Sequence, residues 1–309
     1  MGKYILKRLI HLVWILLAVS FLTFLLLYLA PGDAAAKKLT AQGVAVSEEV
    51  LERTREEMGL NRPFAVQFGD WALHALRGDL GASYKDSLPV AGKLAAGLRH
   101  TLLLALSALA LALVVALPLS ILTALKKDGV LDYVVRFLSF IGNSMPNFLI
   151  SVLLMYFFCV RLRLLPVVAD RSVRGLLLPA LALAIPMCGR FLRQFRAEVL
   201  EQLGKPYVSG ARARGVKARI ILFRNVLRGA LLPILTIVGL SVGTLLGGSV
   251  VIETVFRWPG LGKVAMDAIS ARDIPVVQGF VLLSAVIYTL VNLLTDLAYH
   301  WVDPRVRQK

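Results

Sequence analysis

The sequence is poor in charged side chains and in residues that bind metals or form disulfides. Charged residues make up 17% of the 309 positions, hydrophobic residues make up 58%, and the mean hydropathy is +0.74. The two cysteines, Cys159 and Cys188, lie in apolar stretches and offer neither a disulfide framework nor a metal-ligand pair. The four histidines are scattered, which argues against a histidine metal cage. This composition is typical of membrane proteins rather than soluble domains.

Acidic residues are also scarce. The chain has 19 Asp and Glu against 35 Lys and Arg, which gives a formal net charge of +16. Such a charge often indicates nucleic-acid binding, but here the basic residues flank long apolar stretches, as the positive-inside rule predicts for membrane proteins. We therefore expect membrane lipid around this chain and no nucleic-acid partner.

Enzyme motifs are missing as well. Residues 260–263 read Gly-Leu-Gly-Lys, but Arg257 stands where a phosphate-binding loop needs its first glycine, and Val264 replaces the required Ser or Thr. A membrane hydrolase would need a reactive nucleophile or a metal site that the sequence does not show. We expect no catalytic residue, no metal site and no cofactor bound by this chain.

Long apolar stretches dominate what is present. A bilayer core of about 30 Å is crossed by about 20 apolar residues in a helix. The fourth candidate stretch is short and contains Pro179 and Pro186, so we expect an interrupted span that is buried by protein or lines a cavity. We predict an all-α integral membrane protein with six transmembrane helices, at residues 9–29, 101–125, 133–160, 176–188, 231–252 and 276–299.

The basic residues of the short loops and tails set the expected orientation. Residues 190–233 alone carry ten Lys or Arg and two acidic residues. The positive-inside rule places this segment and both termini in the cytoplasm. Four arginines between the third and fourth spans run against the rule: Arg161, Arg163, Arg171 and Arg174.

Residues 31–100 form a long polar stretch with nine basic and nine acidic residues. Ser47, followed by Glu48 and Glu49, predicts the start of a helix that ends near Gly59, and a second helix is predicted at 63–76. We interpret this stretch as a small helical external domain that caps the outer mouth. The predicted organisation is an N-terminal tail and first helix at 1–30, the external domain at 31–100, and a five-helix core at 101–309.

Polar and small residues inside the spans are candidates for the transport pathway. Asn143, Ser144, Pro146 and Asn147 interrupt the third span, which predicts either a hinge or passage lining, or a plain proline kink. In the fifth span small residues repeat every fourth position on one face, which favours helix packing over pore lining: Gly239, Gly243 and Gly247.

Two acidic residues lie near the ends of spans. We predict that Glu253, at the end of the fifth span, and Asp296, in the last span, form structural pairs with basic groups. The sequence does not show the series of acids that a proton-driven pump uses.

The middle of the basic segment combines small and cationic residues. Small side chains permit close docking of another protein, and arginines supply charge for an acidic partner surface. We predict a cytoplasmic docking surface made by Tyr207, Ser209, Gly210, Ala211, Arg212, Ala213, Arg214 and Gly215.

This run resembles the EAA loop of ABC importer permeases, which docks into a groove of the ATPase subunit. Ser209, Gly210 and Ala211 occupy the E-A-A positions, and Gly215 occupies the position of the motif's glycine. The Ser and Gly depart from the general pattern in a way that is similar to the peptide and nickel branch. Further resemblances to the first permease subunit of dipeptide, oligopeptide and nickel importers lie at residues 30–33, 58–60, 78–83, 144–148, 253–262, 272–275 and 303–305.

The resemblance implies a type I ABC importer permease fold in the cytoplasmic membrane of a prokaryote. It also implies a homologous second permease subunit, two ATPase subunits that hold ATP and Mg²⁺, and an extracytoplasmic substrate-binding protein as partners. The sequence of residues 144–148 leans toward nickel, free or chelated, as substrate, with dipeptides or oligopeptides as the alternative. An ATP-independent secondary transporter or channel is the alternative from another class.

Overall fold

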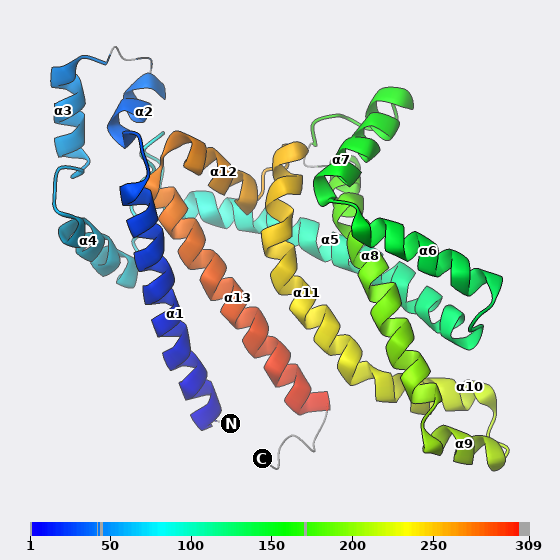
Figure 1. Cartoon of the computed structure of the whole chain (residues 1–309). Coiled ribbons are helices and arrows are strands. Elements are labelled where there is room, and N and C mark those ends of the chain that lie inside the picture. The colour runs from blue at the N-terminus through cyan, green and yellow to red at the C-terminus, as the bar shows by residue number, and fades with distance from the viewer. Residues whose placement is uncertain (1, 42, 44–45, 170–171, 303–309) are drawn as a thin grey trace. The chain divides into compact units, whose positions relative to one another are not determined.

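The computed structural model describes residues 2–41, 43, 46–169 and 172–302. Within these residues the chain is almost entirely helical, and its β-structure is an isolated bridge between Ala82 and Pro89 (Figure 1). The helices are Gly2–Leu29 (α1), Ala34–Ala41 (α2), Glu48–Glu57 (α3), Phe64–Leu76 (α4), Val90–Leu125 (α5), Val130–Ser144 (α6), Asn147–Met155 (α7), Tyr156–Arg161 (the π-helix η1), Val173–Leu203 (α8), Pro206–Ala213 (α9), Ala218–Ile220 (α10), Ile221–Val226 (the π-helix η2), Leu227–Val255 (α11), Leu261–Ala271 (α12) and Ile274–Val302 (α13).

The apolar helices fit the predicted membrane fold. In the described residues five helices are long and apolar enough to cross a membrane, and a sixth span results if α6 is counted together with α7 and η1. This pair is bent by 101° at its break. The prediction of an all-α integral membrane protein with six spans is therefore confirmed.

The chain divides into two compact units. Unit 1 comprises Met1–Thr101 and Pro259–Leu290, and unit 2 comprises Leu102–Trp258 and Val291–Lys309. The long helices α5 and α13 each contribute to both units.

Unit 1 has a core where the start of α5 meets α12 and α13. Val90 and Leu94 of α5 pack with Leu261 of α12 and Val276 of α13. Gly97 makes the approach close, because a Cβ there would lie 3.0 Å from the Cα of Leu261. The first turns of α5 therefore serve as a packing surface for α12 and α13.

The two helices predicted within residues 31–100 are both present. The side-chain oxygen of Ser47 accepts a hydrogen bond from the N–H of Val50 and caps α3, and α4 covers the second predicted helix. Gly78 and Gly81 have φ angles of +82° and +76°, which fits the turn after α4. Residues 31–100 also contain α2, which the sequence pattern did not predict.

Unit 2 is built around α8. Phe191 and Phe195 of α8 are fully buried and stack with ring centroids 5.0 Å apart. Gly189 of α8 lets the backbone of α6 approach closely, because an added Cβ there would lie 2.5 Å from the carbonyl oxygen of Ser139. The core of this unit therefore combines large buried side chains with close backbone contact.

The expected interruption of the fourth span is wrong. Helix α8 runs without a break for 31 residues through Pro179 and Pro186, whereas the third span is the one that breaks. Met145 is extended with ψ of 132°, as the residue before a proline prefers, and Pro146 then starts α7. Dense packing around α8, where Leu178, Pro179 and Ala180 are buried, stabilises the helix despite its prolines.

Candidate functional site

The basic segment 190–233 is largely helical. Helix α8 continues to Leu203, the short helix α9 follows at Pro206–Ala213, and α10 and η2 lead into α11. Lys205 at the N-cap is extended, Pro206 occupies the first helical position, and the ammonium of Lys205 lies 2.9 Å from the Glu201 carboxylate. The predicted docking surface therefore lies on the short helix α9 and on the turn that ends it.

One face of α9 packs against its own chain. Val208 and Ala211 are buried together with Val199 of α8 and with Ile221 and Val226 of η2. This apolar cluster fixes the rotation of α9 about its axis. It also removes Ala211 from any surface that another protein could reach.

The opposite face of α9 and the turn after it are exposed. Most residues of the predicted docking surface lie on this face: Tyr207, Ser209, Arg212, Ala213, Arg214 and Gly215. Gly210 is half-buried. The surface thus presents an aromatic ring, two guanidinium groups and small side chains, which fits an acidic partner with close contact at the helix end.

Gly215 ends α9 in a Schellman motif. Its φ angle is +71°, its N–H donates to the carbonyl oxygen of Arg212 at 3.0 Å, and the N–H of Val216 donates to that of Ala211 at 3.1 Å. Val216 packs on the same apolar cluster as Ala211. A glycine is required here by backbone conformation, since no heavy atom of the described residues would lie within 4 Å of an added Cβ.

Tyr207 is held by a contact with α8 and α11. Its hydroxyl donates to the Gln202 side-chain oxygen at 2.9 Å, while its ring remains 40% exposed. Gly229 of α11 makes room for this pair, because a Cβ there would lie 2.5 Å from the same oxygen. The sequence analysis did not single out Gln202 or Gly229, and no local motif marks them.

The candidate pathway residues of the third span surround the break between α6 and α7. Asn143 and Asn147 are half-buried, and Ser144 and Pro146 are exposed. Gly248 of α11 lies beside this point, since a Cβ there would meet the Asn147 amide nitrogen at 3.7 Å. The bend agrees with both the hinge and the kink interpretation.

The glycine repeat of α11 is less covered than expected for a helix-packing surface within one chain. Gly239 and Gly243 are half-buried, and Gly247 is exposed. At Gly247 an added Cβ would have no described heavy atom within 4 Å.

Of the two acidic residues predicted to form structural pairs, Glu253 of α11 is fully buried, whereas the side chain of Asp296 lies outside the described residues.

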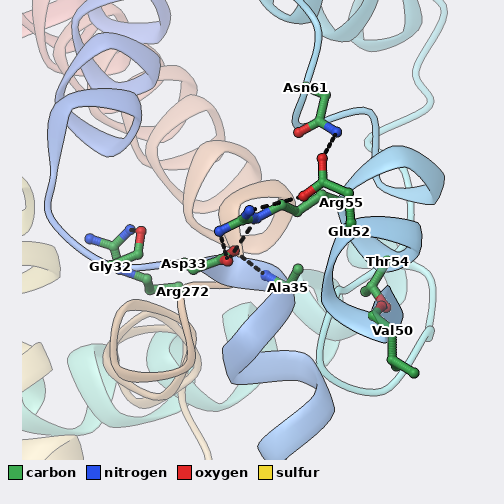
Figure 2. Close-up of polar contacts among 9 residues, drawn as sticks. All are labelled: Gly32, Asp33, Ala35, Val50, Glu52, Thr54, Arg55, Asn61 and Arg272. Atoms are coloured by element: carbon green, nitrogen blue, oxygen red, sulfur yellow. Dashed lines mark hydrogen bonds and ion pairs between the residues drawn. The ribbon is translucent and has the colours of Figure 1, made fainter. Parts of the chain in front are cut away.

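A polar cluster in unit 1 joins two motifs that are distant in the sequence. The Asp33 carboxylate accepts hydrogen bonds from the Ala35 N–H and the Arg55 guanidinium, both at 2.9 Å. Arg272 donates to the carbonyl oxygens of Gly32, at 2.7 Å, and Pro31. Figure 2 shows Arg55 reaching Asp33 and Arg272 lying beside Gly32.

A second polar cluster continues from Arg272. The buried carboxylate of Asp273 accepts from the Ser83 hydroxyl at 2.5 Å and from the Tyr84 N–H at 2.9 Å. Burial, and then the charge of Asp273, raise the pKa of the Tyr84 hydroxyl. Burial also opposes ionisation of Asp86, but hydrogen bonds from the Lys93 ammonium and the Leu88 N–H, together with the Lys93 charge, outweigh it and lower the pKa of Asp86.

These clusters explain several sequence motifs that carried the resemblance. Residues 30–33, 78–83 and 272–275 are far apart in the chain, and the structure ties them together by hydrogen bonds. Sequence reasoning treated them as family signatures without a physical role. Their pairing depends on long-range contacts, which local patterns do not reveal.

The described residues contain no group of three or more His, Cys, Asp or Glu side chains placed to hold a metal ion. The two cysteines are free.

Two family models match this chain. The model of the binding-protein-dependent transport system inner membrane component matches residues 116–308, and the N-terminal model of the same transport systems matches residues 1–105. Together they cover nearly the whole sequence.

Curated relatives match over their full length. A probable peptide ABC transporter permease protein of Sinorhizobium fredii is 39% identical over 99% of this chain and 100% of its own. The glutathione transport system permease protein of Pectobacterium atrosepticum is 37% identical over 100% of both chains. The oligopeptide transport system permease protein of Bacillus subtilis is 36% identical over 99% of both chains.

Solved structures share the fold. The MetNI methionine ABC transporter in an inward-facing conformation aligns with a TM-score of 0.58 at 19% identity, over 68% of this chain and 96% of that chain. An amino acid ABC transporter crystallised with histidines aligns with a TM-score of 0.57 at 18% identity, over 68% and 94%.

Proposed function

This chain belongs to the family of binding-protein-dependent transport system inner membrane components and is a permease subunit of an ABC importer. From this premise we propose that it carries peptides across the membrane. It is a multi-pass protein of the inner membrane. The observation that carries the substrate proposal is the full-length match to relatives named for peptide, oligopeptide and glutathione transport.

Peptides replace nickel as the favoured substrate. The expectation of nickel rested on the sequence of residues 144–148, and it finds no support among these relatives. Selectivity among peptides belongs in part to the binding protein that delivers them.

We propose that four further subunits complete the importer. A homologous second permease forms the other half of the pathway, two ATPases bind ATP and Mg²⁺, and an extracytoplasmic protein delivers the substrate. The family description supports the binding protein, and the ABC transporter relatives support the ATPases. In this arrangement no catalytic residue lies in this chain.

The exposed face of α9 is the proposed contact with an ATPase subunit. Its arginines, Arg212 and Arg214, point away from the apolar cluster that holds the helix, as their exposure indicates. The Schellman turn at Gly215 fixes the end of the helix against its own chain. When the ATPase subunits move, a helix held in this way moves as a rigid body and displaces α8 and α11, against which it packs.

We propose that α9 and both chain termini lie in the cytoplasm. The ten basic residues of 190–233 support this orientation under the positive-inside rule. A cysteine replacing exposed Ser209 should cross-link to an ATPase subunit, whereas one replacing exposed Glu56 on α3 should not. Cross-linking from Glu56→Cys alone would reverse the orientation.

Uptake by the reconstituted complex tests the substrate. Proteoliposomes that contain this chain with its partner subunits are supplied with the binding protein and with either labelled dipeptide and tripeptide or labelled nickel. We expect peptide accumulation and no nickel accumulation. Nickel uptake without peptide uptake would overturn the proposal.

A further inference from the structure

A pocket of about 190 Å³ in unit 2 is lined by three arginines that do not belong to the docking surface on α9. It lies between the end of α5, the first half of α6 and the second half of α8, and α6 and α8 pack on one another there (Figure 1). This arginine pocket combines three guanidinium groups with an apolar wall: Arg136, Arg193 and Arg196, with Val135, Phe140 and Leu192.

A single carboxylate lies behind the three guanidinium groups. The fully buried Asp132 accepts two hydrogen bonds from Arg196, at 2.7 and 2.6 Å. Arg136 is held more loosely, with its Nε 3.5 Å from Asp132 and its guanidinium 4.6 Å from the centre of the Tyr133 ring. The exposed Arg193 has no hydrogen bond or ion pair among the described residues. Three positive charges against one negative charge leave two that these residues do not balance.

The arginine pocket lies where the bilayer core ends. On α8, Arg193 comes 19 residues after Arg174, which is roughly 28 Å along the helix axis and close to the thickness of about 30 Å of a bilayer core. On α5, Thr123 lines the pocket three residues before Lys126, which follows the last residue of that helix. Both helices place the pocket at the same boundary, and in the orientation proposed above this is the cytoplasmic one.

The lining changes from charged to apolar toward the bilayer centre. Helix α6 starts directly after the short loop that follows α5, so it runs from the boundary back into the bilayer. Phe140 comes four residues after Arg136, which places it roughly 6 Å deeper. A ligand that matches the whole pocket therefore carries a negative group at one end and hydrocarbon at the other. An inorganic anion matches only the charged end.

The outer face of α6 favours lipid over a helix of a second permease. Two small residues of this helix, Ser139 and Gly142, are buried, and an added Cβ on Gly142 would lie 3.4 Å from Ile185 of α8. Large residues remain on the outside, with Phe137 and Phe140 each exposed by 65%. Contacts between helices in membranes are enriched in small residues, which α6 directs toward its own chain.

Charge complementarity favours a phosphate over an acidic side chain. Asp and Glu are rare within membrane-spanning segments because their charge is costly there. Every phospholipid, in contrast, carries its phosphate at the boundary of the bilayer core, and basic pockets between transmembrane helices on the cytoplasmic side recognise anionic headgroups. Guanidinium groups match phosphate geometry because they donate two parallel hydrogen bonds.

We propose that the arginine pocket binds an anionic phospholipid of the cytoplasmic leaflet. The phosphate contacts Arg136 and Arg193, whose charges Asp132 does not balance. The hydrocarbon next to the headgroup lies along Val135 and Phe140. Arg196 remains paired with Asp132 and keeps α6 and α8 together at the site.

Photo-crosslinking identifies the occupant. A benzophenone amino acid replaces Phe140, and in the matched control it replaces Phe137, which is equally exposed on α6 but does not line the pocket. The complete complex is irradiated in vesicles of equal parts phosphatidylglycerol and phosphatidylcholine. At position 140 we expect a roughly fivefold excess of phosphatidylglycerol adducts, the factor expected for one arginine at a charged headgroup, and at position 137 near-equal amounts of both lipids.

Two results of this experiment would overturn the proposal. Adducts at position 140 with a protein subunit would show that a partner covers the pocket. The same ratio of the two lipids at positions 140 and 137 would show that the pocket does not select an anionic headgroup. Displacement of the phosphatidylglycerol adducts by inorganic phosphate would likewise contradict it, because the pocket would then take a free anion.

Removal of one guanidinium group tests the arginines. Arg193→Gln leaves the pair of Asp132 with Arg196 in place, and Arg228→Gln, an exposed position of α11 outside the pocket, is the matched control. Native mass spectrometry follows the delipidated complex as phosphatidylglycerol is added. We expect the first lipid to bind roughly fivefold more weakly to the Arg193 variant than to the wild type and the Arg228 variant. Equal affinity in all three, or equal weakening in both variants, would refute a specific site.

Discussion

At the scale of single residues, the proposed docking surface at residues 207–215 depends on two glycines with different physical roles. Gly215 is needed for its backbone angle, with φ of +71° and free space where a side chain would start among the described residues. Gly229 is needed because a side chain there would collide with the Gln202 oxygen, which accepts the hydrogen bond from Tyr207. The two roles predict different outcomes for substitution.

Gly215→Val should uncouple the importer. A β-branched residue at this φ angle costs about 1–2 kcal/mol and favours loss of the Schellman turn, which would misplace the exposed end of α9. Gly78→Val is the matched control, since Gly78 has φ of +82° and equally open surroundings among the described residues. We expect ATP hydrolysis stimulated by loaded binding protein to fall sharply in the Gly215 variant and to persist in the Gly78 variant. An equal loss in both would indicate a general effect of backbone strain.

Gly229→Ala should displace Tyr207 with little effect on stability. The new Cβ would force the Gln202 side chain to move, and the 2.9 Å hydrogen bond to Tyr207 would be lost at a cost of about 0.5–1.5 kcal/mol. We expect reduced peptide uptake with a nearly unchanged melting temperature of the purified complex. Gly204→Ala is the control from the same segment, because its nearest contact would be an ordinary 3.5 Å. Unaltered uptake in the Gly229 variant would remove Tyr207 from the docking surface.

At the scale of elements, the contact of α6 with α8 explains how the chain keeps a bent third span. The Cα of Gly189 lies so close to α6 that an added Cβ would meet the Ser139 carbonyl oxygen at 2.5 Å and the Asn143 N–H nitrogen at 3.2 Å. The Asp132 carboxylate at the start of α6 receives two hydrogen bonds from the Arg196 guanidinium of α8, at 2.7 and 2.6 Å. Helix α6 is therefore fixed to α8 along its length, and the bend follows at its end.

Gly189→Ala should destabilise unit 2. The clash would be with backbone atoms, which cannot rotate away, so overpacking should cost about 1–3 kcal/mol. The measurement is the melting temperature of the purified complex. The control, Gly92→Ala in α5, has no described atom within 4 Å of its added Cβ and should be neutral or slightly stabilising in a helix. A melting temperature of the Gly189 variant equal to that of the wild type would contradict the close packing of α6 on α8.

Sequence reasoning predicted the elements that depend on local signals. The apolar stretches gave the spans, and Ser47 with its two following glutamates gave α3, because hydropathy and capping act within one helix. It predicted the break of the third span around Pro146, which helices α6 and α7 show. It wrongly expected a second interruption in the fourth span, since packing around α8 decides whether Pro179 and Pro186 break the helix. It also missed the pairing of Asp273 with Ser83, which joins residues 190 positions apart.

The docking surface at residues 207–215 likewise has features that the local sequence predicts and features that only long-range packing determines. The composition of residues 207–215 indicated a docking segment, and the structure places most of these residues on an exposed face. The inward position of Ala211 was not predictable, because it is set by Val199, Ile221 and Val226 from other elements. The roles of the residues in docking stay predictions.

At the scale of the whole molecule, the described residues form a membrane-spanning helical fold shared with type I importer permeases. Our proposal gives this chain half of the transport pathway and a docking surface for an ATPase subunit. It predicts that transport depends strictly on ATP hydrolysed by partner subunits, which separates the proposed importer from a secondary transporter or channel.

The most direct test is to measure peptide uptake and ATP hydrolysis in the same proteoliposomes, which contain the complete complex and loaded binding protein. We predict that labelled peptide accumulates with ATP and Mg²⁺ available to the ATPases, and that uptake ceases when ATP is replaced by a non-hydrolysable analogue. Uptake at an undiminished rate without ATP hydrolysis would contradict the account.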